Sequence, residues 1–292
     1  MTSAKTGDRS DDRAYGTGLL RTAIRPCHEG GWLWSREPGP QAPQTFAVVP
    51  PSLTTLLTSL GDGGPDRLAP ARHAGSTRHY QVTGNESLAA RLLNNGPTTE
   101  AETSLLRVGA LLARLHRLTP PSDMPSRRPA GLDRLAHWLS NGAGFGPARE
   151  LLRKALGEVR WGVLGKWCSE VVADSRHVLS HGSPSLGATV MGAAGVELLT
   201  GEDVCMTPWY VDVGWVAGEL VELAWQQGGD HKQWQVLLSA LYSGYGRDLG
   251  NRWNRAAALR TALHLHDFST YVAWRPQDVP RYAGFLSFLI DL

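Results

Sequence analysis

The sequence predicts an α+β protein of two lobes, with a small antiparallel sheet in the N-lobe and a larger helical C-lobe. Two observations predict this arrangement. Up to about Val82, short β-type runs alternate with breaks rich in Gly and Pro. After Gly84, apolar residues recur at helical spacing. A chain of 292 residues that is 42% hydrophobic can bury a substantial core around both lobes.

The N-lobe is predicted over residues 14–83, after a polar tail of residues 1–13 that lacks periodicity and is expected to be disordered. Its strands are expected at Leu19 to Ile24, Gly31 to Trp34, Phe46 to Val49 and Arg78 to Val82. One helix interrupts them. Pro51 suits a first helical position, and Gly61 follows the apolar run SLTTLLTSL, so we expect the helix to end there.

The helical C-lobe is predicted over residues 84–292. Its best-marked helix begins with Thr99 and Glu102, which form a capping box, and it stops before Pro120. The other helices are expected at Glu86 to Leu93, Leu132 to Leu139, Ala148 to Leu156, Lys166 to Ala173, Val213 to Gln227, Gln233 to Gly244, Ala256 to His266 and Val279 to Ile290. Between the fourth and fifth of these, the segment from His177 to Gly201 has a Gly-Ala-Ala-Gly centre that predicts a strand hairpin.

Charge and cysteine content exclude several classes of protein. The net charge of +2 is spread without a Lys/Arg-rich run, so neither a nucleic acid nor an anionic membrane is an expected partner. No apolar stretch reaches the roughly 18 residues that span a bilayer, and the start lacks the apolar core of a signal peptide, which predicts a cytoplasmic protein. Cys27, Cys168 and Cys205 lie far apart, which argues against disulfides and a zinc site.

Two segments carry a family resemblance: GALLARLH, from Gly109 to His116, and SHGSPSLGA, from Ser180 to Ala188, with the stretch that follows it to Trp225. They resemble the aminoglycoside phosphotransferase/choline kinase-like superfamily, which has a two-lobed protein-kinase-like fold. The resemblance covers roughly residues 80–292. It implies ATP and Mg²⁺ as cofactors. It also implies a loop of the form HGDxxxxN that carries a catalytic aspartate and a metal-binding asparagine.

The loop departs from that pattern at its chemical positions. His181 and Gly182 match the superfamily's His-Gly, but Ser183 stands in place of the catalytic aspartate and Ala188 in place of the asparagine. Neither replacement can serve as a carboxylate base or as a hard oxygen ligand for Mg²⁺. If transfer occurs, His181 and Ser183 are the candidates near the acceptor.

Two further aspartates of the superfamily correspond to Asp212 and to position 200, which is Thr200. Asp212, a catalytic candidate together with His181 and Ser183, is expected to cap the helix that follows it and to brace the His-Gly loop. Metal binding is the alternative role for Asp212. Glu202 and Asp203 stand near position 200 and are the candidates for binding the metal.

The N-lobe lacks the lysine that a kinase strand of the V-A-I-K type places against the nucleotide phosphates. The nearest match is Phe46 to Val49, and no lysine occurs between Lys5 and Lys154. The possible replacements for phosphate contact are Arg21, Arg25 and Arg36. The candidates for binding the nucleotide are Tyr80, Val82 and Glu202.

The HGxPSLG loop, the GED triplet and the DVGWxxGELVE helix resemble a narrower group, the phosphotransferase-like proteins of thioamitide and class V lanthipeptide biosynthesis. This implies a kinase-like protein that acts on Ser/Thr of a ribosomal precursor peptide before dehydration, together with a lyase-like partner. The alternative is a catalytically inactive pseudokinase that binds the precursor peptide or scaffolds the partner, and the loss of four catalytic parts favours it. Aminoglycoside resistance is disfavoured, because it depends on the missing aspartates.

The tryptophans have two possible roles, in a peptide-binding groove or in the core. The chain has eleven, and Trp209, Trp215, Trp225 and Trp234 could line a peptide groove, since Trp is favoured at binding hot spots. A place in the core is the favoured interpretation, because Trp215 and Trp225 fall on a predicted helix that must pack.

Overall fold

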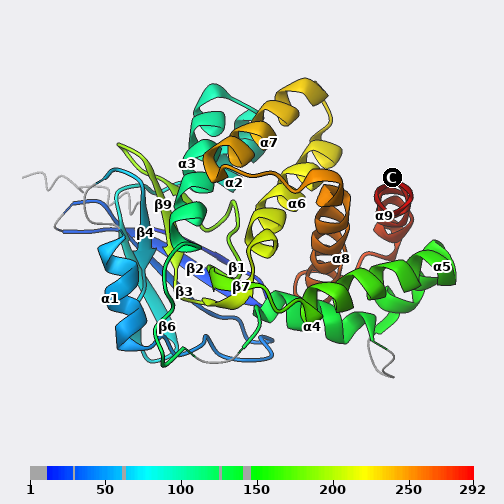
Figure 1. Ribbon diagram of the computed structural model, residues 1–292, viewed down its shortest axis with the longest axis horizontal. Helices are drawn as coiled ribbons and strands as arrows, with labels where there is room; N and C mark the ends of the chain where they lie inside the picture. The colour runs from blue at the N-terminus through cyan, green and yellow to red at the C-terminus, as the bar shows by residue number, and fades with distance from the viewer. Residues whose placement is uncertain (1–11, 29, 61–63, 125–126, 141–145) are drawn as a thin grey trace, which may run out of the picture.

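A computed structural model describes residues 12–28, 30–60, 64–124, 127–140 and 146–292. The strands of the first part of the chain lie at one end of the molecule, and the C-terminal helices lie at the other (Figure 1). The fold is the predicted one, an α+β protein with an antiparallel-sheet N-terminal part and a helical C-terminal part.

A five-stranded antiparallel sheet of order β1-β2-β3-β6-β5 forms the N-lobe. Its strands are β1 (Arg13–Gly16), β2 (Leu20–Pro26), β3 (Trp32–Pro38), β5 (Arg72–Ala74) and β6 (Thr77–Val82). Side chains alternate between the two faces of a strand, and the inner face carries Ile24, Trp34 and Tyr80, which are almost completely buried. Helix α1 (Pro51–Ser59) contributes Leu53 and Leu57 to the same core.

The predicted strand at Phe46 to Val49 is wrong. Residues 45–50 are irregular and lead into α1, and Val48 is 78% exposed. Because β6 pairs with β3 in the sheet, this apolar run has no strand to pair with. The other three predicted strands are confirmed as β2, β3 and β6. Of the predicted tail, residues 1–11 lie outside the described residues, and Arg13 already belongs to β1.

A second sheet joins the two lobes. Strand β4 (Arg67–Pro70) runs parallel to β9 (Val196–Thr200), which pairs in turn with β8 (Thr189–Met191). The predicted turn between β8 and β9 is confirmed, with the Gly192 amide donating to the Gly195 carbonyl over 2.9 Å. The N-lobe therefore supplies one strand to the hairpin of the C-lobe.

The C-lobe helices are α2 (Leu88–Asn95), α3 (Thr99–Leu115), α4 (Ala130–Leu139), α5 (Gly146–Ala173), α6 (Trp209–Gln227), α7 (His231–Tyr245), α8 (Trp253–Tyr271) and α9 (Val279–Asp291). Short 3₁₀ turns at Gly250–Arg252 and Pro276–Asp278 precede the last two. Two predicted helices join in α5 across a kink at Gly157, which has φ of +77°. The capping prediction is wrong by one residue: Thr98 is the N-cap and accepts from the Ala101 amide.

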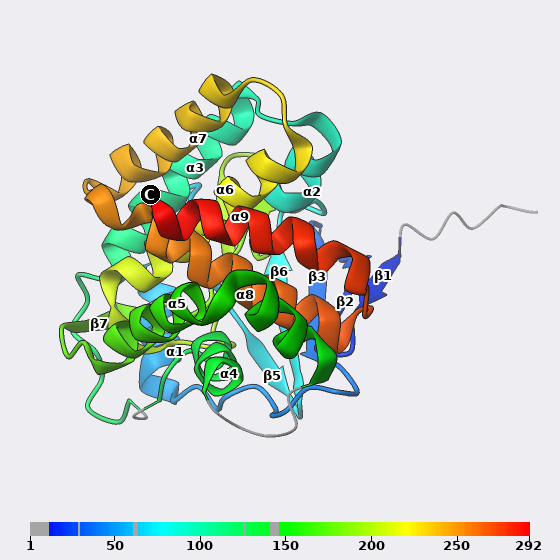
Figure 2. The same cartoon turned by 90° about the vertical axis from the view of Figure 1, so that its right-hand side faces the viewer.

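The helices form two groups with separate cores. One hydrophobic cluster runs from the N-lobe sheet through α3, α6 and α7. A second cluster joins α4, α5, α8 and α9, and Figure 2 shows α5, α8 and α9 together on one side of the molecule. Trp234 is buried in the first cluster, and the partly buried Trp225 packs against the second, where it stacks on Phe285 of α9. Within the described part of the chain, no helix combines the length and apolar character needed to cross a bilayer.

Candidate functional site

The His-Gly loop is held by Asp212. This residue lies in the first turn of α6 and is fully buried. Its carboxylate accepts from the amides of His181 and Gly182, over 2.7 and 3.0 Å. It is also 3.0 Å from Nε2 of His116, whose Nδ1 lies 2.8 Å from the Tyr245 hydroxyl. Asp212 therefore braces the loop, but the helix begins at Trp209, so Asp212 is not its N-cap.

The conformation of the loop depends on the absence of a side chain at Gly182. This residue has φ of +90°, in the left-handed region, and a Cβ there would come within 1.9 Å of the Asp203 carbonyl oxygen. Strand β7 (His177–Ser180) leads into the loop and pairs with β10 (Cys205–Pro208). The loop and the GED segment are thus packed backbone against backbone.

His181 is placed inside the protein and not toward an acceptor. Its Nε2 lies 2.8 Å from the Leu199 carbonyl, and its Nδ1 is buried without a hydrogen-bond partner in the described structure. Burial lowers the pKa of the His181 imidazole, which favours the neutral ring. As placed, the ring braces the loop and is poorly positioned to carry a proton.

Ser183 and Ala188 differ in their exposure to solvent. Ser183 is partly exposed on the loop. Ala188 is buried in the core, and its amide donates to Ser185. Thr200 is also fully buried, and its hydroxyl donates to the Leu198 carbonyl. Of these positions, only Ser183 is exposed enough to meet a substrate.

Glu202 lies at the boundary between the lobes and is engaged by the N-lobe. Its Oε1 accepts from the Tyr80 hydroxyl over 2.8 Å and lies 3.0 Å from the Arg36 guanidinium. The Glu202 and Arg36 side chains are each 13% exposed. Burial and the neighbouring Glu202 raise the pKa of Tyr80, so its hydroxyl stays protonated and donates. Arg36 lies on the third strand, which is the strand that carries the phosphate-binding lysine in protein kinases.

A second arginine on the same face forms no ion pair with the described residues. Arg78 of β6 is the register partner of Arg36 in β3, and only 2% of it is exposed. One Nη donates to the Ala47 carbonyl, and the guanidinium lies 5.6 Å from the centre of the Phe46 ring. Its Nε and other Nη are buried without a hydrogen-bond partner among the described residues. The inner face of the sheet therefore carries two guanidinium groups beside the single carboxylate of Glu202.

Arg78 was not among the residues predicted from sequence, although a signal exists. In β6, Tyr80 and Val82 are buried, and a strand places every second residue on the same face, which includes Arg78. Of the arginines that were predicted, only Arg36 faces inward. Arg21 and Arg25 pair with Glu37 and Asp12 on the exposed face, where more than half of each arginine side chain is accessible.

Asp203 contacts the start of a helix, whereas Glu202 contacts the N-lobe sheet. Both of its oxygens lie about 3 Å from the Ala130 amide at the start of α4. Burial raises the pKa of Asp203 to about 7, against the opposing effects of that amide and of nearby Arg127. In the described residues there is no group of three His, Cys, Asp or Glu side chains that could hold a metal ion. As arranged, the carboxylates of Glu202 and Asp203 both contact groups of the protein.

Val82 and the segment after it connect the lobes. Val82 is buried at the end of β6. The amide and the hydroxyl of Thr83 both donate to Glu197 of β9, over 2.5 and 2.9 Å. The Gly84 carbonyl accepts from the Trp34 indole over 2.9 Å. The polar groups of Thr83 and the Gly84 carbonyl are therefore already bonded within the protein, and the side chain that Val82 offers is apolar.

No protein-family model matches the sequence, and no curated protein matches it. Solved structures do match over nearly the whole chain. The amicoumacin kinase hAmiN, in complex with AMP-PNP, Ca²⁺ and amicoumacin, has a TM-score of 0.61 at 9% identity, covering 95% of this chain and 88% of that one. The choline kinase LicA from Streptococcus pneumoniae has a TM-score of 0.56 at 9% identity, covering 96% and 94%.

A choline kinase from Cryptosporidium parvum also matches, with a TM-score of 0.52 at 9% identity over 98% of this chain and 89% of that one. Sequence identity this low shows a common fold and nothing finer. The chain therefore has the kinase-like fold of the small-molecule phosphotransferases, as its HG loop and hairpin predicted.

Proposed function

We propose that this chain is a kinase-fold phosphotransferase of ribosomal-peptide natural-product biosynthesis. In this proposal it phosphorylates Ser or Thr of a precursor peptide, and a lyase-like partner then removes the phosphate and the α-proton to leave a dehydroamino acid. The observation that carries the phosphotransferase part is the pair of arginines on the inner face of the N-lobe, Arg36 and Arg78, beside one carboxylate.

Phosphate oxygens would supply what Arg78 lacks. A guanidinium binds phosphate through a planar fork of N–H donors, and Arg78 has two such donors buried and unused. Arg36 lies on the same face, on the strand where protein kinases keep their lysine. We therefore assign Arg36 and Arg78 to phosphate binding, with Tyr80 and Glu202 positioning Arg36 through their contacts at 2.8 and 3.0 Å.

The proposed cofactors are ATP and a divalent ion, and the hAmiN structure holds AMP-PNP and Ca²⁺. The arginines fit the phosphates, but the contacts of Glu202 and Asp203 do not fit a metal ion, so we assign no step to the metal. Phosphoryl transfer depends mainly on positioning and electrostatic stabilisation. Ser183 can orient an acceptor hydroxyl, but it cannot act as a carboxylate base, and we expect transfer to be slower by about 10²–10⁴-fold than with an aspartate.

The second candidate is a pseudokinase that binds the peptide or its lyase-like partner without transferring phosphate. The specific observation in its favour is that Ala188 is buried in the core and that Ser183 replaces the base. The two candidates predict different results with nucleotide, and two experiments separate them.

The first experiment is a thermal melt with tripolyphosphate and with ATP, each with and without Mg²⁺. A ligand at a hundredfold over its Kd stabilises the folded state by about 2.7 kcal/mol, which is a shift of several degrees. We expect the shift in the wild-type protein and its loss in Arg78→Met. Arg72→Met is the matched control, because Arg72 is exposed on the neighbouring strand β5. Absence of a shift in the wild-type protein would reject the phosphate site.

The second experiment is mass spectrometry of a candidate Ser- and Thr-containing precursor peptide after incubation with ATP and the protein. Transfer adds about 80 Da for each phosphoryl group. Loss of that product in Arg36→Met and Arg78→Met, but not in Arg72→Met, would support the phosphotransferase. A melt shift without any product, with the lyase-like partner also present, would instead favour the pseudokinase.

A further inference from the structure

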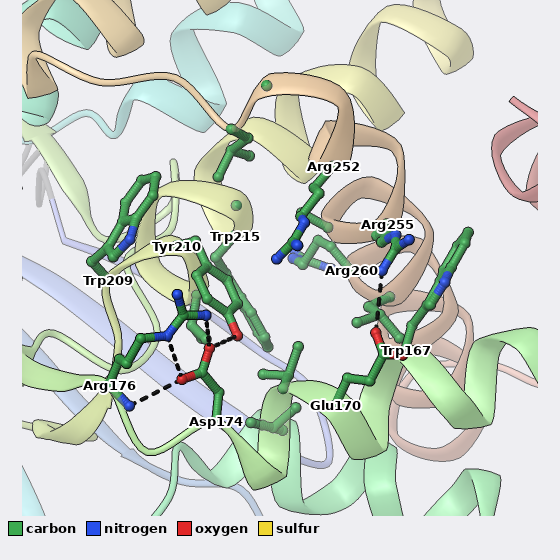
Figure 3. Close-up of a pocket in the computed structure, with 18 of the residues that line it drawn as sticks. Trp167, Glu170, Asp174, Arg176, Trp209, Tyr210, Trp215, Arg252, Arg255 and Arg260 are labelled. Atoms are coloured by element: carbon green, nitrogen blue, oxygen red, sulfur yellow. Dashed lines mark hydrogen bonds and ion pairs between the residues drawn. The ribbon is translucent and has the colours of Figure 1, made fainter.

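The C-lobe contains a second candidate site, a cavity of about 830 Å³. It lies between the end of α5, the start of α6, the segment 247–252 and helix α8, and its lining is drawn in Figure 3. Its volume is toward the upper end of the range for small-molecule pockets. Neither Arg36 nor Arg78 lines it, so it is separate from the proposed phosphate site.

The walls of the cavity are aromatic and held in place. Its lining includes Trp167, Trp209, Tyr210 and Trp215. The Trp209 ring stacks on Tyr245, with ring centres 5.3 Å apart. The Tyr210 hydroxyl donates to Asp174 over 2.8 Å. In Figure 3, Trp209 and Tyr210 lie on one side of the cavity and Trp167 on the other. Such rings give a bound molecule a large apolar contact that needs little reordering.

The cavity also has a surplus of positive charge. Five arginines line it, against three acidic residues. Three of these arginines have carboxylate partners: Arg176 with Asp174, Arg255 with Glu170 and Arg260 with Glu219.

The other two arginines, Arg247 and Arg252, form no ion pair with any residue in the described ranges. The Arg247 guanidinium lies 4.1 Å from the centre of the Trp209 ring, and Arg252 extends toward the middle of the cavity in Figure 3. The remaining acidic residue, Asp248, accepts from the Gly250 amide. Two guanidinium groups are thus available to an anion.

We propose that this cavity binds an acidic segment of a peptide, with a carboxylate between Arg247 and Arg252 and apolar side chains against the aromatic walls. Trp, Tyr and Arg are the residues that contribute most to peptide and protein binding. The inference rests on the proposed function in one respect, that the molecule bound is a peptide.

The position of the cavity suits a docking site for such a substrate. Asp174 and Arg176 lie just before β7, and the His-Gly loop with Ser183 follows its other end. A strand of four residues is about 13 Å long. A peptide needs about four or five extended residues to span that length. One chain could then place an acidic segment in the cavity and a hydroxyl near Ser183.

The test is capture of random short peptides by the immobilised protein without nucleotide, followed by sequencing of the bound fraction. In the peptides bound by the wild-type protein, we expect Asp and Glu to be enriched about tenfold over Lys and Arg. High salt should reduce this enrichment, because it screens the charges. The double variant Arg247→Gln/Arg252→Gln should lose this enrichment. The control Arg153→Gln/Arg160→Gln removes the same charge from exposed positions on α5 and should keep it.

The charge-reversal variant Arg252→Glu serves as a second test and should shift the enrichment in the bound peptides toward Lys and Arg. Enrichment of basic peptides by the wild-type protein, no enrichment, or acidic enrichment that survives the double variant would overturn the proposal. Because capture uses no nucleotide, it is independent of Arg78. If the protein transfers phosphate but captures no acidic peptide, only the docking site is rejected. If it captures acidic peptides but transfers no phosphate, only the phosphotransferase activity is rejected.

Discussion

Asp212 and Arg78 are buried and Asp203 is partly buried, and these three ionisable residues differ in how many of their polar atoms have hydrogen-bond partners. Asp212 accepts two loop amides and contacts His116, which makes it the brace of the His-Gly loop. Asp203 has one amide partner, and its pKa is raised. Arg78 has two donors without partners in the described structure. The brace was predictable from the motif. The partners of Asp203 and Arg78 depend on the directions of their side chains, which the motif does not specify.

Arg78→Met is expected to stabilise the ligand-free protein. A buried donor without a partner costs about 1–3 kcal/mol, and Met fills similar space without donors. The loss of the Ala47 hydrogen bond offsets part of this gain. We expect a rise of a few degrees in the melting temperature without phosphate. The exposed control Arg72→Met should leave it unchanged, and a lower value for Arg78→Met would show that the guanidinium is satisfied.

The raised pKa of Asp203 predicts that the free energy of unfolding falls as the pH rises. Its pKa is about 7 in the folded protein and about 3.9 in an unfolded chain. Between these values the folded state holds a proton that the unfolded state has released, so the free energy of unfolding decreases from about pH 4 to about pH 7. Asp203→Asn keeps the acceptor for Ala130 and removes the titration.

Urea unfolding at several pH values in that window measures the effect. The slope for Asp203→Asn should be flatter than for the wild-type protein. Asp133→Asn is the matched control, because Asp133 lies on α4, the helix whose Ala130 amide donates to Asp203, and 43% of its side chain is exposed. Equal slopes for the wild-type protein and Asp203→Asn would contradict the prediction.

Gly182→Ala is expected to disrupt the loop. The new Cβ would lie 1.9 Å from a carbonyl oxygen, and the residue would also have to adopt φ of +90°. We expect insoluble or strongly destabilised protein in a denaturation assay. Gly162→Ala is the contrasting change, because a Cβ there meets nothing within 4 Å, and it should stabilise helix α5 by about 1 kcal/mol.

At the level of the elements, long periodic helices were the easiest to predict, because their apolar spacing is repeated several times. Short strands were harder. β4 has four residues, and its partner β9 lies 130 residues away, so no local pattern identifies it. The run Phe46 to Val49 has strand-forming residues but no neighbouring strand. The arrangement of the candidate site could not be predicted for the same reason, since contacts such as Arg36 with Glu202 join distant parts of the chain.

The joining sheet depends on Glu197 of β9. This carboxylate is buried and accepts from Arg67 of β4 and from the amide and hydroxyl of Thr83. Glu197→Ala leaves these donors unpaired, and we expect a loss of about 3 kcal/mol or more. Chemical denaturation measures it. Glu158→Ala, an exposed control, should cost less than about 0.5 kcal/mol.

At the level of the whole molecule, one of the two hydrophobic clusters spans both predicted lobes. A single hydrophobic cluster includes Ile24 and Trp34 of the N-lobe together with Leu105 of α3 and Leu198 of β9. We therefore expect that residues 12–83 and 84–292, expressed separately, remain unfolded, and that a mixture of the two recovers native-like ellipticity. Cooperative unfolding of the isolated 84–292 fragment would show that the C-lobe folds by itself.

The parallel pairing of β4 with β9 also affects how the chain is made. Arg67 leaves the ribosome 130 residues before its partner Glu197. At about 5–20 residues per second, the edge of β4 waits roughly 7 to 26 s for that partner. During this interval the nascent N-lobe exposes an unpaired edge and the apolar face that the hairpin later covers. Its folding yield should therefore depend on chaperones that bind early, and it should improve when translation is fast across residues 70–200.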